Sequence, residues 1–319
     1  MNCLCCGKPL EKPNDTGWHE ACVKRFFGVS GFPDIDMGDK ALEVLAETTT
    51  QKGFTVAGVQ KKLSLHLSSQ GRSSRLTLVD YPTGYLLKPQ VKEFEHLPEA
   101  EHLVMEMADA SGISTVPHAL IQKNGIYAYI TKRVDRIFDE VGVHKLAMED
   151  FCQLDHRLTA DKYKGSYERC AKIIQKYSSQ SGLDVAEFYF RLLFCFVTGN
   201  SDMHLKNFSL LETQEASGTY MLSPAYDLLP VNILMENDKE EEFALTMNGE
   251  RRNLRKKDFL IFAKECELPE KAAARMMDKM VSLKSKYLDL CAQSLLPDSL
   301  KKRFAALMER RCEVLQPRP

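Results

Sequence analysis

The sequence predicts an α+β fold in which a small antiparallel sheet comes first and a mainly helical part follows. Two observations lead to this prediction. Short β-rich runs separated by Gly and Pro fill the chain to about residue 135, and long patterns with helical spacing dominate the rest. The chain has 319 residues, of which 44% are hydrophobic and 27% charged, enough to bury a sizeable core. We therefore expect two lobes of different secondary structure.

Changes in composition divide the chain into three segments. Residues 1–28 are rich in Cys, Gly and Pro and read as a separate N-terminal segment. Residues 29–135 form the expected sheet lobe, and residues 136–319 form the expected helical lobe. The change of character at residues 132–135 indicates a hinge.

The expected elements can be placed in order along the chain. Extended segments are expected at 59–67, 76–79, 84–88, 118–122 and 126–134, with helices at 39–49 and 98–110 among them. Further helices are expected at about 144–155, 166–178, 184–198, 255–266, 269–293 and 297–314, around an extended stretch at 208–230.

Charge and hydropathy exclude several classes of protein. The net charge of −1 gives no sign of direct nucleic-acid binding or of a membrane surface. The opening residues have no apolar signal region, and the most apolar stretch, 185–197, contains Glu187 and Arg191 and is too short to span a bilayer. Scattered cysteines in apolar contexts fit a reducing compartment. We expect a cytoplasmic protein with no membrane partner.

The strongest chemical signal is the run GNSDMHLKNF, which directly follows the apolar stretch. Asp202 and Asn207 have the D-x4-N spacing of a kinase catalytic loop, in which the Asp accepts the substrate hydroxyl proton and the Asn binds a metal ion. Asp227, in SPAYDL, could supply a second metal carboxylate. Taken alone, the first pair also fits a polar loop, and Asp227 also fits a capped turn.

Two weaker signals precede this loop. Lys88 ends an apolar strand, where a kinase places the lysine that binds the α- and β-phosphates, and Glu101 in the next helix could pair with it. The small-residue run TVAGVQKK at 55–62 suits a backbone that approaches phosphate. The order of loop, Lys, Glu, hinge, D-x4-N and Asp is that of a protein-kinase-like fold.

Several longer stretches of the sequence carry a specific family resemblance. The phrases FTVAGVQKKLSL, YLLKPQ, AEHLVMEMA, ITKRVDR, KLAMEDFCQL, GNSDMHLKNFSLL and LSPAYDLLP resemble the HipA family of toxin kinases, especially its shorter HipT-like members. The resemblance covers residues 53 to about 312. It implies a HipA-like, two-lobed kinase fold that uses ATP and Mg²⁺.

The resemblance also implies roles for individual residues. Asp202 would be the catalytic base, Asn207 and Asp227 would bind Mg²⁺, and Lys88 would bind ATP phosphates. The other implied ATP contacts are Ala57, Gly58, Val59, Gln60, Lys61 and Lys62 in the nucleotide loop, Lys132, Arg133 and Val134 in the hinge, and His204, Leu205, Lys206 and Tyr226. Lys132 departs from the family, in which an acidic residue can occupy that position. Thr55 matches an inhibitory autophosphorylation site, and Ala57 replaces the second hydroxyl found in some members.

The implied function is that of a toxin serine/threonine protein kinase in a bacterial toxin–antitoxin system. Family substrates are glutamyl- or tryptophanyl-tRNA synthetases, whose phosphorylation would inhibit translation and growth. Implied partners are a DNA-binding HipB-like antitoxin, through which alone DNA would be reached, and a small HipS-like protein that replaces an N-terminal subdomain. Two alternatives are a catalytically silent binding module in an antitoxin–DNA complex and a small-molecule kinase. The intact set of Lys88, Asp202, Asn207 and Asp227 argues against the first, and the phrases KLAMEDFCQL and AYDLLP argue against the second.

The cysteines at the start of the chain suggest a separate site. Cys3-x-x-Cys6 and His19-x-x-Cys22 have the spacing of a tetrahedral structural Zn²⁺ site. Cys5 adds a further thiol, so the ligand set is open from the sequence alone. A reduced cysteine-rich tail is an equal alternative.

Overall fold

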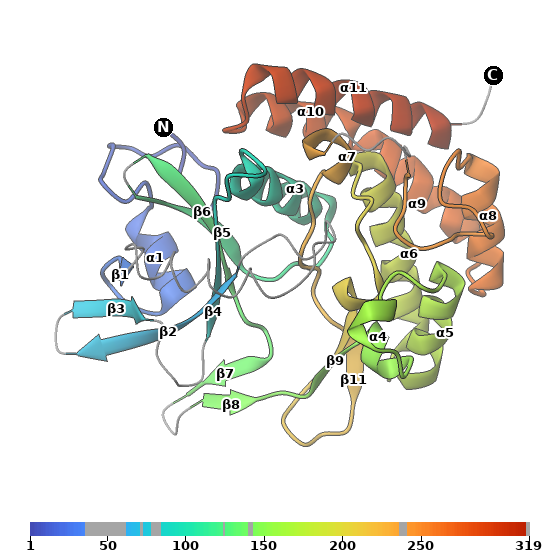
Figure 1. Cartoon of the computed structure of the whole chain (residues 1–319), viewed down its shortest axis with the longest axis horizontal. Coiled ribbons are helices and arrows are strands. Elements are labelled where there is room, and N and C mark those ends of the chain that lie inside the picture. The colour runs from blue at the N-terminus through green and yellow to red at the C-terminus, as the bar shows by residue number, and fades with distance from the viewer. Residues whose placement is uncertain are drawn as a thin grey trace. The chain divides into compact units, whose positions relative to one another are not determined.

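The computed structural model describes residues 1–35, 62–70, 73–77, 84–123, 125–139, 143–235 and 241–316. The chain divides into two compact units (Figure 1). Unit 1 comprises residues 1–102 and 116–136, and unit 2 comprises residues 103–115 and 137–319. The expected α+β class is confirmed, since the largest sheet lies in unit 1 and most of the helices lie in unit 2.

Unit 1 is built on a six-stranded sheet. Its elements are α1 (Glu20–Phe27), β1 (Asp34–Ile35), β2 (Leu63–Gln70), β3 (Ser73–Thr77), β4 (Tyr85–Pro89), the first residues of α3 (Leu97–Ser111), β5 (His118–Lys123) and β6 (Ile126–Lys132). The strand order is β1-β3-β2-β4-β6-β5. All neighbours are antiparallel except β1 and β3, which run parallel, so the expectation of a purely antiparallel sheet is wrong at this one edge. The helix expected at 39–49 lies outside the described residues.

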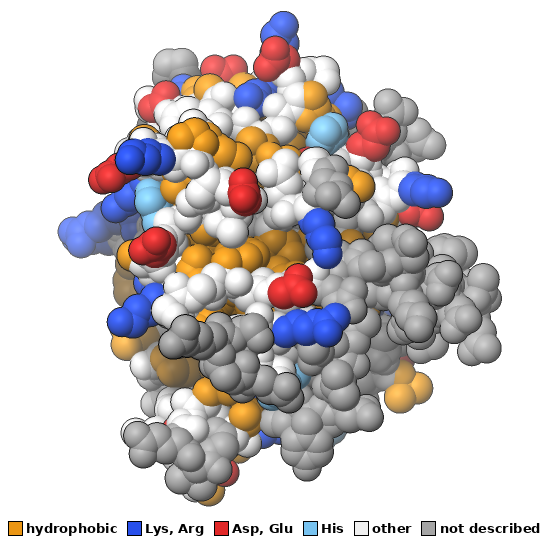
Figure 2. Space-filling view, turned by 90° about the vertical axis from the view of Figure 1, so that its left-hand side faces the viewer, with side chains coloured by type: hydrophobic (Ala, Val, Ile, Leu, Met, Phe, Trp, Pro, Cys, Tyr) orange, Lys and Arg blue, Asp and Glu red, His pale blue; other side chains and the backbone are white. Residues whose placement is uncertain are grey.

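Aromatic side chains attach the N-terminal segment to this sheet. Trp18 is 1% exposed and packs against Phe26, Phe27 and Phe32, with ring centroids 5.4–5.5 Å apart. Phe26 and Phe27 in turn contact Tyr85 of β4. Large aromatic side chains contribute most of the apolar area buried in a small core, so Trp18, Phe26 and Phe27 join the N-terminal segment to the core of unit 1. Among the residues coloured in Figure 2, acidic and basic side chains are interspersed with hydrophobic ones, in keeping with the net charge near zero.

Unit 2 is mainly helical, with short strands among its helices. Its elements are the rest of α3, β7 (Arg136–Phe138, whose first residue belongs to unit 1), β8 (Val143–Lys145), β9 (Met148–Asp150), α4 (Phe151–Leu154), η2 (Thr159–Asp161), α5 (Tyr167–Tyr177), α6 (Ser181–Thr198), η3 (Leu205–Asn207), β10 (Ser209–Glu212), β11 (Tyr220–Leu222), α7 (Val231–Leu234), α8 (Lys256–Glu265), α9 (Glu270–Ser282), α10 (Lys284–Gln293) and α11 (Asp298–Leu315).

The helix expected at 144–155 is wrong. Residues 148–150 instead form β9, which pairs with β10, and the chain becomes helical only at Phe151. Asp150 begins α4 as its N-cap, and Gln153 completes a capping box, so the helix cannot extend toward the N-terminus. The pattern at 269–293 is also interrupted, because α9 ends at Ser282 and α10 begins at Lys284.

Helix α6 forms the centre of unit 2. It is buried almost throughout from Val185 to Thr198, as expected of a helix that is apolar on all sides. It ends at Gly199, whose φ of 69° is left-handed and whose backbone N–H bonds back into the helix. A Cβ at this position would overlap Leu307 of α11, so the close approach of α11 also requires glycine. Among the described helices, none combines the length and apolar character of a membrane span.

Candidate active site

The loop after α6 folds around the backbone of Asp202. The carbonyl oxygen of Asp202 accepts hydrogen bonds from the side-chain amide of Asn207 at 2.9 Å and from the backbone N–H of His204 at 2.8 Å. The backbone N–H of Asp202 donates to the side-chain oxygen of Asn200 at 3.3 Å. Because the amide nitrogen of Asn207 is used in this way, its oxygen is the end of the side chain that can bind a cation. The structure therefore brings Asp202 and Asn207 together in one tight loop.

The carboxylate of Asp202 has a specific partner, Tyr163. The Tyr163 hydroxyl donates to Oδ1 of Asp202 across 2.8 Å. Burial raises the pKa of Asp202 to about 6, and the negative charge of Asp227 acts in the same direction. The hydrogen bond from Tyr163 and the positive charge of Lys162 oppose that rise. A carboxylate with a pKa near neutrality suits a general base better than an ordinary aspartate does.

Asp227 lies in a strained backbone conformation. Its φ is 57°, in the left-handed region that residues other than glycine rarely adopt. Just before it, the backbone N–H of Ala225 donates to the carbonyl of Ser114 at 2.7 Å. Tyr226 bonds to the hydroxyl of Ser209 at 2.6 Å and donates to the carbonyl of Lys206 at 3.2 Å. These contacts hold the segment that leads into Asp227, and a positive φ at a residue other than glycine is found more often at functional positions than elsewhere.

His204 and Lys206 of the same loop have different surroundings. His204 is 4% exposed, and burial lowers its pKa to about 4, so its imidazole is neutral near pH 7. Its ring packs edge-on against that of Tyr163, with centroids 5.0 Å apart. Within the described part of the chain, its Nδ1 has no hydrogen-bond partner. The amine of Lys206 instead donates to the carboxylate of Asp150 at 2.5 Å.

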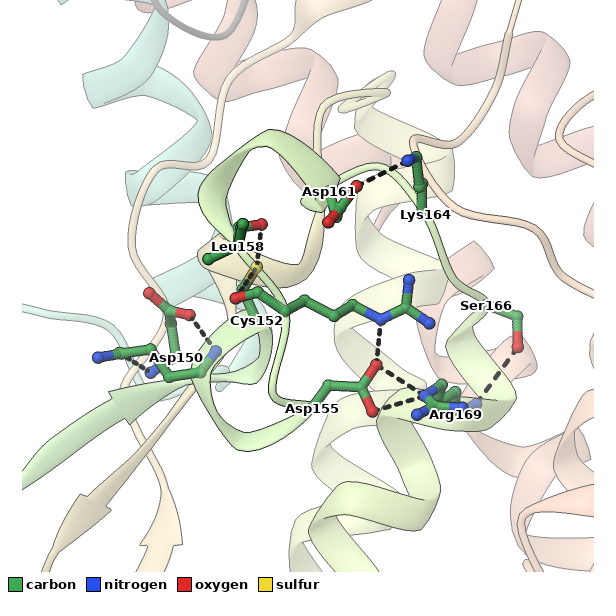
Figure 3. Close-up of polar contacts among 10 residues, drawn as sticks. Asp150, Cys152, Asp155, Leu158, Asp161, Lys164, Ser166 and Arg169 are labelled. Carbon is green, nitrogen blue, oxygen red and sulfur yellow. Dashed lines mark hydrogen bonds and ion pairs between the residues drawn. The ribbon is translucent and has the colours of Figure 1, made fainter.

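Figure 3 shows the polar contacts in and around the loop at residues 155–164, which carries Tyr163. The carboxylate of Asp155 forms an ion pair with Arg157. Its two oxygens also accept hydrogen bonds from Nε of Arg169, at 2.6 and 2.7 Å. Its side chain is 6% exposed, so the pairs are shielded from water on one side. At the far end of the loop, the carbonyl of Lys162 accepts from the backbone N–H of Leu205 at 3.1 Å. The loop thus positions Tyr163 against Asp202.

In unit 1, Lys88 and Glu101 form a buried ion pair. Nζ of Lys88 lies 2.6 Å from Oε1 of Glu101, and the two side chains are 5% and 0% exposed. Nζ also lies 5.4 Å from the ring centroid of Tyr129, the cross-strand neighbour of Lys88 on β6. The strand β4 and the helix α3 therefore bring together the two residues that the sequence pattern suggested could pair.

The remaining residues expected at the site lie in varied places. At the end of β6, the backbone N–H of Arg133 donates to the carbonyl of Gly84 at 2.8 Å, and its guanidinium binds Asp135 at 2.7 Å. Lys132 ends that strand, Val134 follows it, and Lys62 is exposed just before β2. Thr55 and the nucleotide-loop residues Ala57, Gly58, Val59, Gln60 and Lys61 lie outside the described residues.

Three features of the site could not be found from the sequence: Tyr163, Lys162, and the ion-paired group of Asp155, Arg157 and Arg169, called here the Asp155 cluster. Tyr163 lies 39 residues before Asp202 in the chain, and no local sequence motif predicts the contact between them. Sequence reasoning also missed the ion pairs of Asp135, to which both Arg133 and Arg136 donate. Burial would raise the pKa of Asp135, but these two guanidinium groups more than offset burial and lower it. The only available signal was the density of charged residues in the phrase ITKRVDR.

Comparison with solved structures places the fold of this chain among those of kinases. The fold resembles that of HipA from Shewanella oneidensis, solved with HipB and operator DNA, with a TM-score of 0.69 and 19% identity over 87% of this chain and 70% of that one. It also resembles the Helicobacter pylori proinflammatory kinase CtkA, with a TM-score of 0.56 and 15% identity over 83% of this chain and 92% of that one. These likenesses confirm the expected kinase fold.

The family follows from the sequence match. Residues 54–286 match the HipA-like C-terminal domain, so the chain belongs to that family. Similar sequences include the protein named Putative kinase Y4dM from Sinorhizobium fredii, 32% identical over 68% of this chain and 55% of that protein. Another, named Putative kinase, from Haemophilus influenzae is 26% identical over 57% of this chain and 54% of that protein. The chain thus spans about half the length of the curated relatives it matches.

Proposed function

We propose that this protein transfers the γ-phosphoryl group of ATP to a hydroxyl group of a protein. The observation that carries the proposal is the environment of Asp202. Its carboxylate is partly buried, accepts a hydrogen bond from Tyr163 at 2.8 Å and has a pKa of about 6, while its backbone carbonyl accepts a hydrogen bond from Asn207. Asp202 would accept the proton that leaves the attacking hydroxyl.

The donor set near Asp202 fits a hard divalent cation. Asp227 offers a carboxylate and Asn207 an amide oxygen, and oxygen ligands of this kind suit Mg²⁺. The negative charge of Asp227 raises the pKa of Asp202. A bound cation would offset the repulsion between these two carboxylates. Bound Mg²⁺ would neutralise phosphate charge. Lys88, fixed by Glu101, would bind the α- and β-phosphates.

The remaining nucleotide contacts are proposals based on family membership. They comprise Ala57 to Lys62 in the nucleotide loop, Lys132 to Val134 in the hinge, His204 to Lys206, and Tyr226. Autophosphorylation at Thr55 would place negative charge beside the phosphates of ATP and so inhibit the enzyme. Mass spectrometry of the protein after incubation with ATP would detect phosphate at Thr55, and its absence from active protein would refute this part of the proposal.

The physiological role is proposed from the relatives. HipA of Shewanella oneidensis was solved with HipB and operator DNA, which supports a DNA-binding HipB-like antitoxin as a partner here. The HipT-like subtype, the HipS-like partner and an aminoacyl-tRNA synthetase as substrate follow from the sequence resemblance. A cytoplasmic location is supported by the ten cysteines, all among the described residues, none of which forms a disulfide.

A transfer assay with radiolabelled ATP and Mg²⁺ tests the proposal directly. Glutamyl- and tryptophanyl-tRNA synthetases would be offered to the wild-type protein, to Asp202→Asn and to Asp289→Asn. Asp289 is an exposed carboxylate on α10, so its variant controls for the loss of one negative charge. We expect label on a synthetase or on the kinase itself with wild type and Asp289→Asn, and almost none with Asp202→Asn. Absence of label from all three proteins, after phosphatase treatment, would contradict the proposed activity.

A further inference from the structure

Three cysteines and one histidine converge at the N-terminus of unit 1. The Sγ atoms of Cys3, Cys6 and Cys22 and a ring nitrogen of His19 all lie within 4.8 Å of one another. Nδ1 of His19 is 3.5 Å from Sγ of Cys6 and 3.9 Å from Sγ of Cys22. Around tetrahedral zinc with the usual bond lengths, neighbouring ligand atoms are about 3.5–3.8 Å apart. We propose that these four residues hold a structural Zn²⁺ ion.

The backbone preorganises the two halves of this site. After Cys3, the chain turns back on itself through hydrogen bonds from Cys3 to the carbonyl of Lys8 at 2.8 Å and from Gly7 to the carbonyl of Cys3 at 2.9 Å. Gly7 takes a left-handed φ of 67° that this turn requires. His19 and Cys22 lie at the N-cap and in the first turn of α1. A tight turn and a helix start therefore each present two ligands.

Neighbouring groups set the chemistry of the ligands. Nε2 of His19 lies 3.0 Å from the carbonyl oxygen of Pro9, which can only accept a hydrogen bond. Nε2 must then carry the proton, and Nδ1 is left with the lone pair that a metal needs. The backbone N–H of His19 donates to Sγ of Cys3 at 3.4 Å, and Arg25 donates to Sγ of Cys22 at 3.7 Å. A hydrogen bond to sulfur favours its thiolate form, although burial and the neighbouring thiols raise the pKa of Cys22 itself.

Cys5 lies between two ligands in sequence, yet its thiol is not among the four converging groups. It lies beside them, where it interacts with Arg25 and Cys22. Four protein ligands complete a tetrahedral shell, which leaves no open position for a substrate. The ion would therefore act on stability rather than on catalysis.

What the ion would hold in place is the edge of the main sheet. The backbone N–H of Leu120 on β5 donates to the carbonyl of Leu4 at 2.8 Å, and the indole of Trp18 donates to the carbonyl of Leu120 at 2.9 Å. Leu4 follows one ligand in the chain and Trp18 precedes another. Binding of Zn²⁺ would thus fix the segment that covers this edge strand.

Metal analysis of the full chain tests the proposal. The wild-type protein, Cys6→Ser, Cys22→Ser and Cys5→Ser would be produced with added zinc, dialysed and measured by mass spectrometry for metals. We expect one Zn²⁺ per chain in the wild type and in the matched control Cys5→Ser, with at least a tenfold loss in Cys6→Ser and Cys22→Ser. A wild-type protein free of zinc, or equal loss of zinc in Cys5→Ser and Cys6→Ser, would overturn the assignment.

A second measurement covers the case in which the ligand variants fail to fold. Wild-type protein would be stripped with a chelator and refilled with Co²⁺, which reports its geometry in visible absorption. Strong absorption typical of tetrahedral thiolate coordination supports the site, and weak absorption of an octahedral ion overturns it. Asp202→Asn should bind the same amount of metal as wild type, so this result stands apart from the proposed kinase activity.

Discussion

The hydroxyl of Tyr163 donates a hydrogen bond to Oδ1 of Asp202 across 2.8 Å. This contact joins the loop at residues 155–164 to the loop after α6, and it favours the ionised form of the carboxylate. Asp202 can accept a proton only when it is ionised, so the strength of this bond helps to set the pH at which the site works.

The first prediction concerns the pH profile of phosphoryl transfer. Asp202 has a pKa of about 6, so the rate should fall as the pH decreases through 6. Tyr163→Phe removes a hydrogen bond to the charged form, which should raise the pKa of Asp202 and move the acid limb up by about one pH unit. Single-turnover rates between pH 5 and 9 would measure the shift. Equal profiles for both proteins would refute the role of Tyr163, whereas a uniform loss at every pH would indicate a purely structural one.

The second prediction concerns the buried pair of Lys88 and Glu101. Glu101→Leu would leave the ammonium group of Lys88 buried without its carboxylate, which should cost about 3–5 kcal/mol of unfolding free energy. Lys88→Met combined with Glu101→Leu should be more stable than either single variant, because no buried charge is left. Urea unfolding of all four proteins gives the coupling energy. Additive losses would show that the two charges do not stabilise each other.

The third prediction concerns the glycine that ends α6. Gly199→Ala forces a side chain into a left-handed backbone and against Leu307, so it should destabilise the protein by about 2 kcal/mol or more. Gly182→Ala is the matched control, since Gly182 lies in the same helix with no atom within 4 Å of a Cβ. There the alanine should be neutral or stabilise by about 0.5–1 kcal/mol. Thermal unfolding of both variants measures the difference, and equal effects would contradict the steric argument.

The fourth prediction concerns the loop that carries Tyr163. Asp155→Ala removes the shared acceptor of Arg157 and Arg169, so residues 155–164 should become more mobile. Hydrogen–deuterium exchange should rise in this loop while α6 and α9 keep their protection. The transfer rate should fall about tenfold as Tyr163 loses its position. Unchanged exchange in the loop would show that the Asp155 cluster does not hold it.

Much of the fold was accessible from the sequence because hydrophobic periodicity reports burial. The helices at 166–178, 184–198, 255–266 and 297–314 were confirmed within a few residues, as were the strands from 84 to 134. The helix predicted at 144–155 was wrong because the helical spacing of that stretch gave no sign that β9 pairs with β10, about 60 residues away in the chain. Cross-strand partners decide such ambiguous segments, and a local pattern does not contain them.

For the candidate site too, the sequence predicted residues that are close along the chain and missed contacts between distant ones. Asp202 and Asn207 were predicted together because one short loop carries both, and Lys88 and Glu101 because consecutive elements carry them. Their catalytic roles stay predictions. Tyr163, Lys162 and Asp155 could not be found, since each acts through a contact formed only by the folded chain. Hydrogen bonds between distant loops leave no spacing for a sequence pattern to detect.

The two hydrogen bonds at Leu120 restrict how another chain could join this sheet. A strand of six residues such as β5 alternates its backbone groups between its neighbour β6 and the open side. Leu120 lies within β5, and both of its backbone groups on the open side are taken by Leu4 and Trp18. A peptide from a partner therefore cannot add to β5 as a continuous seventh strand while the N-terminal segment is in place. Recognition of this protein by strand addition would require release of that segment, whereas binding through side chains would not.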